Sequence, residues 1–141
     1  MTRFVLDNSV AMRWLVQSHK SEDQTYADSV LKTLLEAEAV VPDLWHLEAA
    51  NVLLGVEKRG EITTGEIEGF ISQLEKLPII VDSQTSRQSF SRTLTLGKAY
   101  KLSSYDASYL ELAIRESTPL ATLDKALKKA AVSADVKIYL K

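Results

Sequence analysis

Short apolar runs alternate with longer helical patterns along this sequence, and the alternation restricts the folds that the chain can adopt. The runs are continuous, which is typical of strands buried on both faces of a sheet. They are Phe4 to Leu6, Val40 to Val41, Ile79 to Val81, Leu120 to Leu123 and Val136 to Leu140. Helical patterns cover residues 22–38, 43–59, 63–76, 84–100, 105–117 and 125–131. Strands separated by helices predict an α/β sandwich with a parallel sheet.

The length of 141 residues suits one compact domain, so we expect a single domain over residues 1–141. The chain has no cysteine, which excludes disulfides, thiolate metal sites and cysteine nucleophiles. No signal segment opens the sequence, and no apolar run reaches the roughly 18 residues of a membrane span. We therefore expect a cytoplasmic protein that does not enter the membrane.

Two aspartates follow directly on predicted strands. Asp7 comes after the first apolar run, and Asp124 comes after the fourth. Ligand sites in parallel α/β sheets gather at the carboxyl ends of the strands, so neighbouring strands would bring these carboxylates together. Like charges in close contact repel, and a shared divalent cation relieves that repulsion. The alternative is that Asp7, Ser9 or Asp124 only caps the helix that follows it.

Glu48 lies within a nearly continuous apolar stretch from Leu44 to Val56. In a helix it shares a face with Leu47 and with Asn51, which follows three residues later. A charged carboxylate on an apolar surface requires a cation, and residues 33–57 contain no lysine or arginine. A metal ion or a basic residue distant in the sequence must supply the positive charge. A structural salt bridge to another helix remains the alternative.

Asp106 follows Ser103 at nearly the spacing of a capping box, and an aspartate in a first helical turn also suits the helix dipole. A purely structural role is therefore open. The rest of this helix, with Leu110, Ala113 and Ile114, has a core-like side. Since Asp106 stands at the end of that side, we expect its carboxylate to point inward.

These observations together predict one acidic metal site at the carboxyl edge of the sheet, formed by Asp7, Glu48, Asp106 and Asp124. Oxygen ligands without cysteine favour Mg²⁺ or Mn²⁺ over zinc. Such an ion activates water and neutralises charge on a phosphate, so the site suits hydrolysis of a phosphodiester. Asp43 and Asp82 also follow predicted strands, but nothing else in their segments converges on them.

The distribution of charge is uneven although the net charge is only −2. Residues 1–82 carry 7 basic and 14 acidic side chains, whereas residues 83–141 carry 10 basic and 5 acidic ones. Such asymmetry indicates either a surface that binds phosphate or a solvated helix face that happens to be basic. The candidate residues of such a phosphate-binding surface are Arg87, Arg92, Lys98, Lys101 and Lys125.

Four motifs, taken in order, carry a resemblance to a known family. They are Leu6-Asp7-Asn8-Ser9, Glu48-Ala49-Ala50-Asn51, Tyr105-Asp106-Ala107-Ser108-Tyr109 and Ala121-Thr122-Leu123-Asp124. The set resembles PIN-domain nucleases, and most of all the VapC-type toxins of prokaryotic toxin–antitoxin pairs. The resemblance spans the chain from Phe4 to Tyr139.

This resemblance implies a three-layer α/β/α sandwich with a five-stranded parallel sheet, in which the first strand is central and the fourth lies beside it. It implies that the four acids bind Mg²⁺ or Mn²⁺. It also implies that the hydroxyls of Ser9 and Thr122 support the site's water or a neighbouring carboxylate, and it matches Asn51 to a polar position one turn after the glutamate. The implied partners are an RNA substrate, a second copy in a homodimer, and a cognate antitoxin.

Two other functions are open at this point. One is a metal-dependent phosphatase or phosphoacceptor domain that uses Asp7, although Asp7-Asn8 offers only one acid where such a site requires a pair. The other is a non-catalytic module that binds RNA or protein, in which the acids only cap helices and pair across the core.

Overall fold

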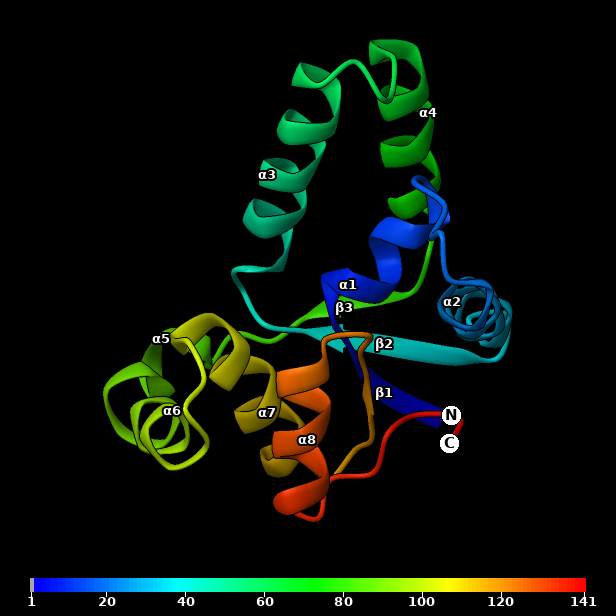
Figure 1. The fold of residues 1–141 in the computed structure, drawn as a ribbon. Coiled ribbons are helices and arrows are strands. Elements are labelled where there is room, and N and C mark those ends of the chain that lie inside the picture. Colours follow the sequence, from blue (N-terminus) through cyan, green and yellow to red (C-terminus); the bar gives the residue numbers. More distant parts are fainter. Residues whose placement is uncertain (1) are drawn as a thin grey trace.

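A four-stranded parallel sheet forms the centre of the molecule. The computed structural model describes residues Thr2–Lys141 (Figure 1). The strands are β1 (Thr2–Leu6), β2 (Ala37–Val41), β3 (Ile79–Val81) and β4 (Leu120–Ala121). Their order is β3-β2-β1-β4, and all three pairings are parallel. β1 therefore lies between β2 and β4, as expected, and the α/β prediction with a parallel sheet is confirmed.

Helices lie on both sides of this sheet. They are α1 (Asn8–Ala11), the 3-10 helix η1 (Met12–Trp14), α2 (Ser21–Thr33), α3 (Trp45–Lys58), α4 (Thr64–Leu74), α5 (Thr85–Gln88), the π-helix η2 (Ser89–Thr93), α6 (Leu94–Tyr100), α7 (Ser104–Glu116) and α8 (Lys125–Ser133). Figure 1 shows α3 and α4 rising on one side, and α7 and α8 on the other. No helix between Thr2 and Lys141 has the length and apolar content needed to cross a bilayer.

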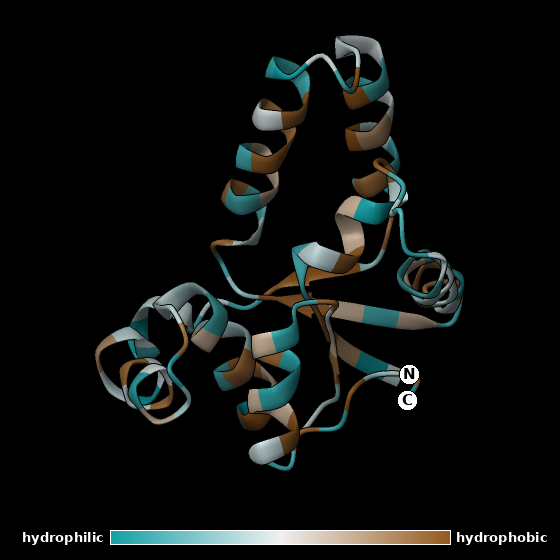
Figure 2. Cartoon of the chain, in the orientation of Figure 1, coloured by the Kyte–Doolittle hydropathy of each residue, from teal (hydrophilic) through white to brown (hydrophobic). Residues whose placement is uncertain are grey.

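The core is built around β1. Phe4, Val5 and Leu6 have no exposed surface, as a continuous apolar run in a covered sheet predicts. Figure 2 shows the central strands as the most hydrophobic part of the ribbon. The ring of Tyr139 stacks on Phe4 with 4.0 Å between ring centroids. This packing fixes β1, and the residue that follows it, in the middle of the molecule.

The α3–α4 hairpin depends on local turn chemistry. Gly60, just after α3, has a φ of 73°, a left-handed conformation that glycine adopts without steric cost. Thr63 and Glu66 then form a reciprocal capping box that begins α4. α3 itself begins four residues after the carboxyl end of β2, which places Glu48 near that edge of the sheet.

The prediction of five strands is wrong, because the run from Val136 to Leu140 makes only one parallel bridge, between Leu120 and Ile138. Asp135 and Leu140 have φ values of 60° and 64°, so extended backbone is interrupted at both ends of the run. The amide of Val136 also donates to the carbonyl of Ala131 at the end of α8. Too few extended residues remain to form a ladder.

Two predicted helices have different bounds in the structure. The helix over 22–38 ends at Thr33, because residues 37 and 38 already belong to β2. The helix over 84–100 is interrupted by η2. Ser89 and Thr95 donate their hydroxyls to carbonyl oxygens four residues earlier, which weakens regular helix bonding in this segment. The other predicted helices agree within a few residues.

Candidate active site

Asp7 occupies the carboxyl end of the central strand. Its amide donates to the carbonyl of Ala121 at 3.0 Å, so it stands where β1 and β4 end together. The side chain is only 7% exposed. Asp7 is at the N-cap position of α1 but makes no capping hydrogen bond with its side chain. Helix capping therefore does not explain this carboxylate.

Two hydroxyls hold Asp7 in place. Oδ2 accepts hydrogen bonds from Ser9 Oγ at 2.6 Å and Thr122 Oγ1 at 2.8 Å. Ser9 Oγ in turn accepts from the amide of Leu123 at 2.9 Å, and Thr122 Oγ1 accepts from the amide of Asp124 at 3.0 Å. The network ties the ends of β1 and β4 into one rigid unit.

The two carboxylate oxygens of Asp124 differ in their hydrogen bonding. Oδ1 accepts from the amide of Leu127 at 2.9 Å, which caps α8 as the alternative interpretation expected. Oδ2 accepts no hydrogen bond from residues 2–141. The capping bond orients the carboxylate at the same sheet edge as Asp7, so the structural role and a ligand role are compatible.

Glu48 is held by a tyrosine that sequence reasoning missed. Tyr109 Oη donates to Glu48 Oε1 at 2.5 Å. Asn8 Nδ2 lies 3.4 Å from the same Oη and donates to the carbonyl of Trp45 at 3.0 Å. Tyr109 follows Asp106 by one helical turn, and this spacing was the signal available in the sequence.

The surroundings predicted for Glu48 are wrong in part. α3 buries Trp45 and Ala49, whereas Leu47 is 78% exposed. Glu48 itself is half-buried at the boundary between these faces. Asn51 is exposed and makes no hydrogen bond with Glu48, so the structure does not bring Asn51 into the site. The outer face of the helix also exposes Leu54.

Asp106 lies in the first turn of α7. Its amide donates to Ser103 Oγ at 3.1 Å, so Ser103 is the N-cap. The reciprocal half of a capping box is not formed, and the Asp106 carboxylate accepts no hydrogen bond within the described chain. It is partly buried and faces the other acids, whose charges act on it.

Burial and neighbouring negative charge raise the pKa of Asp7, Glu48 and Asp106. Burial raises the pKa of Asp7, and the charges of Glu48 and Asp124 raise it further. Burial also raises the pKa of Glu48. The pKa of Asp106 is raised to about 6, first by burial and then by the charges of Asp124 and Asp7. Burial raises the pKa of Tyr109, which keeps it protonated as a donor to Glu48. The site therefore holds concentrated, uncompensated negative charge.

No lysine, arginine or histidine in the described chain forms an ion pair with these four acids. A divalent cation fits the donor set, because all candidate ligands are carboxylate oxygens. As the side chains stand, no three His, Cys, Asp or Glu residues from 2 to 141 surround a single point. Glu48 Oε1 accepts from Tyr109, and Asp124 Oδ1 accepts from the amide of Leu127. The structure brings the acids to one edge without closing them into a ligand shell.

Asp82, which also follows a strand, has a different environment. Arg115 Nη1 and Nη2 donate to its two oxygens at 3.0 and 2.7 Å. Nε and Nη2 of the same guanidinium donate to Glu111 at 2.8 and 3.0 Å. Glu111 is only 2% exposed. This ion cluster is compensated and accounts for both acids structurally.

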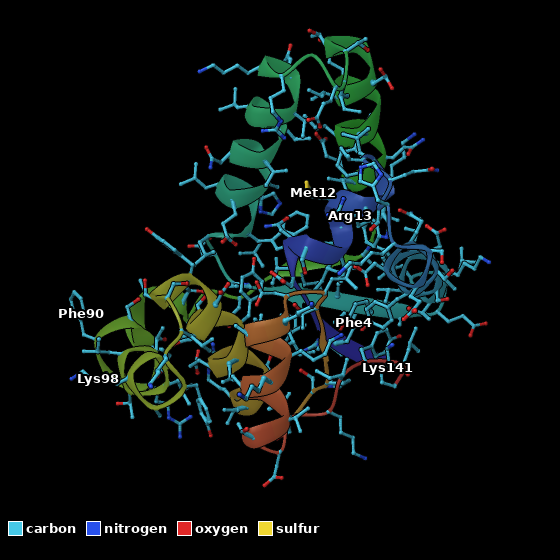
Figure 3. The ribbon with its side chains drawn as sticks, in the orientation of Figure 1. Phe4, Met12, Arg13, Phe90, Lys98 and Lys141 are labelled. Atoms are coloured by element: carbon cyan, nitrogen blue, oxygen red, sulfur yellow. The ribbon has the colours of Figure 1, made fainter. Side chains whose placement is uncertain are left out.

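The predicted basic residues are exposed and do not form one patch with the acids. Arg87, Arg92 and Lys98 lie on the segment from α5 to α6, and Figure 3 shows Lys98 on the outer side of that segment. Lys101 ends α6 with a left-handed φ of 57°, two residues before the cap of α7. Lys125 is the first residue of α8, directly after Asp124. Lys101 and Lys125 are thus nearest to the acids along the chain.

Comparison with known proteins supports the α/β fold described above. The family model described as PIN domain matches residues 4–133. Among solved structures, the crystal structure of PAE2754 from Pyrobaculum aerophilum is similar, with a TM-score of 0.65 and 18% sequence identity. The match covers 92% of this chain and 79% of that one. At this identity the likeness supports the fold. No curated protein matches the sequence.

Proposed function

Because the chain belongs to the PIN-domain family, we propose that it is a metal-dependent endoribonuclease that acts as the toxin of a toxin–antitoxin pair. PIN domains are generally metal-dependent nucleases, so the family supplies the reaction class. The structural observation that supports the proposal is the gathering of Asp7, Glu48, Asp106 and Asp124 at one sheet edge without a basic partner. Acids that only stabilised the fold would be paired, as Asp82 and Glu111 are.

In this proposal Asp7, Asp106 and Asp124 hold Mg²⁺ or Mn²⁺, and Glu48 binds it directly or through water. Such an ion supplies activation of water and neutralisation of charge on the phosphate and leaving oxygen. Ser9 and Thr122 fix one oxygen of Asp7 and leave Oδ1 to face the site. Tyr109 fixes Glu48 in the same way. Preorganised carboxylates reduce the reorganisation needed when substrate binds.

The biological role rests on the motif resemblance alone. We propose a single nuclease domain over residues 1–141, in the cytoplasm, that forms a homodimer and is inhibited by a cognate antitoxin. RNA is the proposed substrate, with exposed basic residues such as Lys101 and Lys125 binding its backbone. Expression of the active chain without an antitoxin should then arrest growth of a bacterial host, and Asp7→Asn should relieve the arrest.

The test compares wild type, Asp7→Asn and Asp28→Asn for cleavage of total RNA with Mn²⁺ and with EDTA. Asp28 is exposed on α2 and provides the same chemical change away from the site. We expect cleavage by wild type and Asp28→Asn only with Mn²⁺. Asp7→Asn should be at least about a hundred-fold slower, because a ligand worth several kcal/mol in the transition state is lost.

Circular dichroism would establish that all three proteins are folded. Equal cleavage by wild type and Asp7→Asn would contradict the proposal and indicate a contaminating nuclease. Absence of cleavage by any of them, across ribosomal, transfer and messenger RNA, would favour a non-catalytic binding module.

A further inference from the structure

A cavity of about 490 Å³ lies beside the acidic site and is lined by one of its four acids, Asp124. It lies between η1, the start of α2, α3 and the connection from β4 to α8. Asn8, Ser9 and Asp124 form the end that it shares with the acidic site. Its volume is in the range of about 300–1,000 Å³ that small-ligand sites occupy. Anything bound at the acids can therefore extend into this cavity.

The walls of the cavity combine apolar and basic groups. Met12, Val52, Val56 and Leu123 provide apolar surface, and the basic side chains are Arg13, His19 and Arg59. A cavity with apolar walls and a cation suits a ligand with a flat organic part and a negative charge.

The two arginines differ in their pairing. Arg59 Nε donates to Glu61 Oε1 at 2.8 Å, so Arg59 is already neutralised within the cavity wall. Arg13 is partly buried, and its side chain makes no hydrogen bond or ion pair with residues 2–141. Figure 3 shows Arg13 on η1, beside Met12. Asp23, the other acid in the wall besides Asp124 and Glu61, is not bonded to it.

An unpaired, partly buried guanidinium beside a concentrated negative site is placed to receive an anion brought in by a ligand. The planar fork of arginine binds phosphate with two parallel hydrogen bonds. A polynucleotide with its scissile phosphate at the acids must carry a neighbouring phosphate close by. The negative acids and the positive Arg13 therefore match two adjacent parts of one RNA strand.

We propose that Arg13 binds the phosphate next to the scissile one, and that the apolar wall of this cavity accepts the base or ribose of that nucleotide. The inference rests on the proposed function, since it names a substrate subsite of that same active site. It differs from the sequence prediction, which placed RNA binding on residues 87–101 and Lys125.

The first test measures RNA binding without cleavage, on the Asp7→Asn background in EDTA. The probe is a short fluorescein-labelled single-stranded RNA, followed by anisotropy over a range of salt concentrations. Arg13→Gln should raise Kd about ten-fold, because it removes one charged contact with a phosphate. The slope of log K against log salt should fall by about 0.7, the value for one phosphate contact in a single strand.

Two matched variants control the measurement. Arg13→Lys keeps the charge and should retain the salt slope while losing the bidentate geometry. Lys137→Gln removes an exposed positive charge near the start of β4, at the opposite edge of the sheet, and should change neither Kd nor slope. In the otherwise wild-type protein with Mn²⁺, Arg13→Gln should raise KM with little change in kcat.

The outcomes separate this inference from the proposed function. If wild type cleaves RNA, Asp7→Asn does not, and Arg13→Gln has the Kd and slope of Lys137→Gln, the nuclease stands and the subsite is overturned. If no RNA is cleaved but Arg13→Gln alone weakens RNA binding, phosphate binding by Arg13 stands, whereas its place next to a scissile phosphate fails together with the catalytic proposal. Circular dichroism of Arg13→Gln and Arg13→Lys would establish that both variants are folded. If both variants weaken RNA binding equally, the proposed role of the Arg13 charge is overturned.

Discussion

Helix α7 contributes one acid to each of two groups whose surroundings are opposite. Near its start, Asp106 joins the acids at the sheet edge, and the described chain offers them no basic partner. Further along the same helix, Glu111 and Asp82 share the guanidinium of Arg115 through four hydrogen bonds. One helix thus contributes to an uncompensated group and to a compensated one.

The contrast separates acids that serve the fold from acids that serve a ligand. A buried carboxylate without a partner costs free energy, and a chain that can supply Arg115 to one pair could supply a cation to the other. Groups left in such an environment, with raised pKa values, are typical of functional sites.

The largest expected effect is on the compensated group. Arg115→Met should lower the free energy of unfolding by about 3 kcal/mol, because it leaves Asp82 and Glu111 partly buried without a cation. Urea denaturation followed by circular dichroism would measure it. Arg59→Met, which breaks an exposed pair with Glu61, is the control and should cost less than about 1 kcal/mol. A cost no larger than that of the control would remove the contrast.

The next effect is on the uncompensated group. Mn²⁺ should raise the thermal midpoint of the wild type in a saturable way. At a Mn²⁺ concentration a hundred times the dissociation constant, the free energy of unfolding should rise by about 2.7 kcal/mol. Asp7→Asn should lose this shift, since it removes a ligand, whereas Glu111→Gln should keep it. Differential scanning fluorimetry with Mg²⁺, Mn²⁺ and EDTA would measure it. A shift that persists in Asp7→Asn would place the ion elsewhere.

The smallest effect is the pH dependence of stability without metal. The pKa of Asp106 is raised to about 6 in the folded protein, above its unfolded value near 3.8. Protonation therefore favours the folded state, and the stabilisation is fully present below about pH 4 and lost as the pH rises through 6. Asp106→Asn should reduce this loss by about 1 kcal/mol after allowance for solvent screening.

Urea midpoints at several pH values in EDTA would test this dependence, with Asp28→Asn as the exposed control. A variant that loses stability between pH 4 and 7 as steeply as the wild type would mean that Asp106 does not feel the neighbouring acids.

The sequence predicted those parts of the fold that depend on local patterns. β1 and the helices α3, α4, α7 and α8 follow from apolar runs and helical periodicity. The prediction of a fifth strand was wrong, because nothing in the sequence marks Asp135 and Leu140 as residues with a left-handed backbone. The sequence also did not predict the π-helix, since hydroxyl-to-backbone hydrogen bonds disturb the helix without changing the helical periodicity of the sequence.

For the site, the sequence was informative about residue type and position but not about partners. Asp7 and Asp124 follow strands, and the structure places them at one edge. Arg115 was not predicted to pair with Asp82, because 33 residues separate them and only the fold brings them together. Arg13 was not singled out for a related reason, since its lack of a side-chain partner among residues 2–141 shows only in the structure.

The hydrogen bond from Thr122 to Asp7 also bears on biosynthesis, since it joins residues 115 positions apart. A ribosome completes β1 long before it makes β4, so a nascent chain displays Asp7 without the hydroxyl and the strand that orient it. Long-range parallel pairing of this kind forms late and slowly. The acidic edge is therefore assembled only after nearly the whole chain has left the exit tunnel. Because β4 is synthesised so late, the four acids cannot come together while the ribosome is still translating the chain.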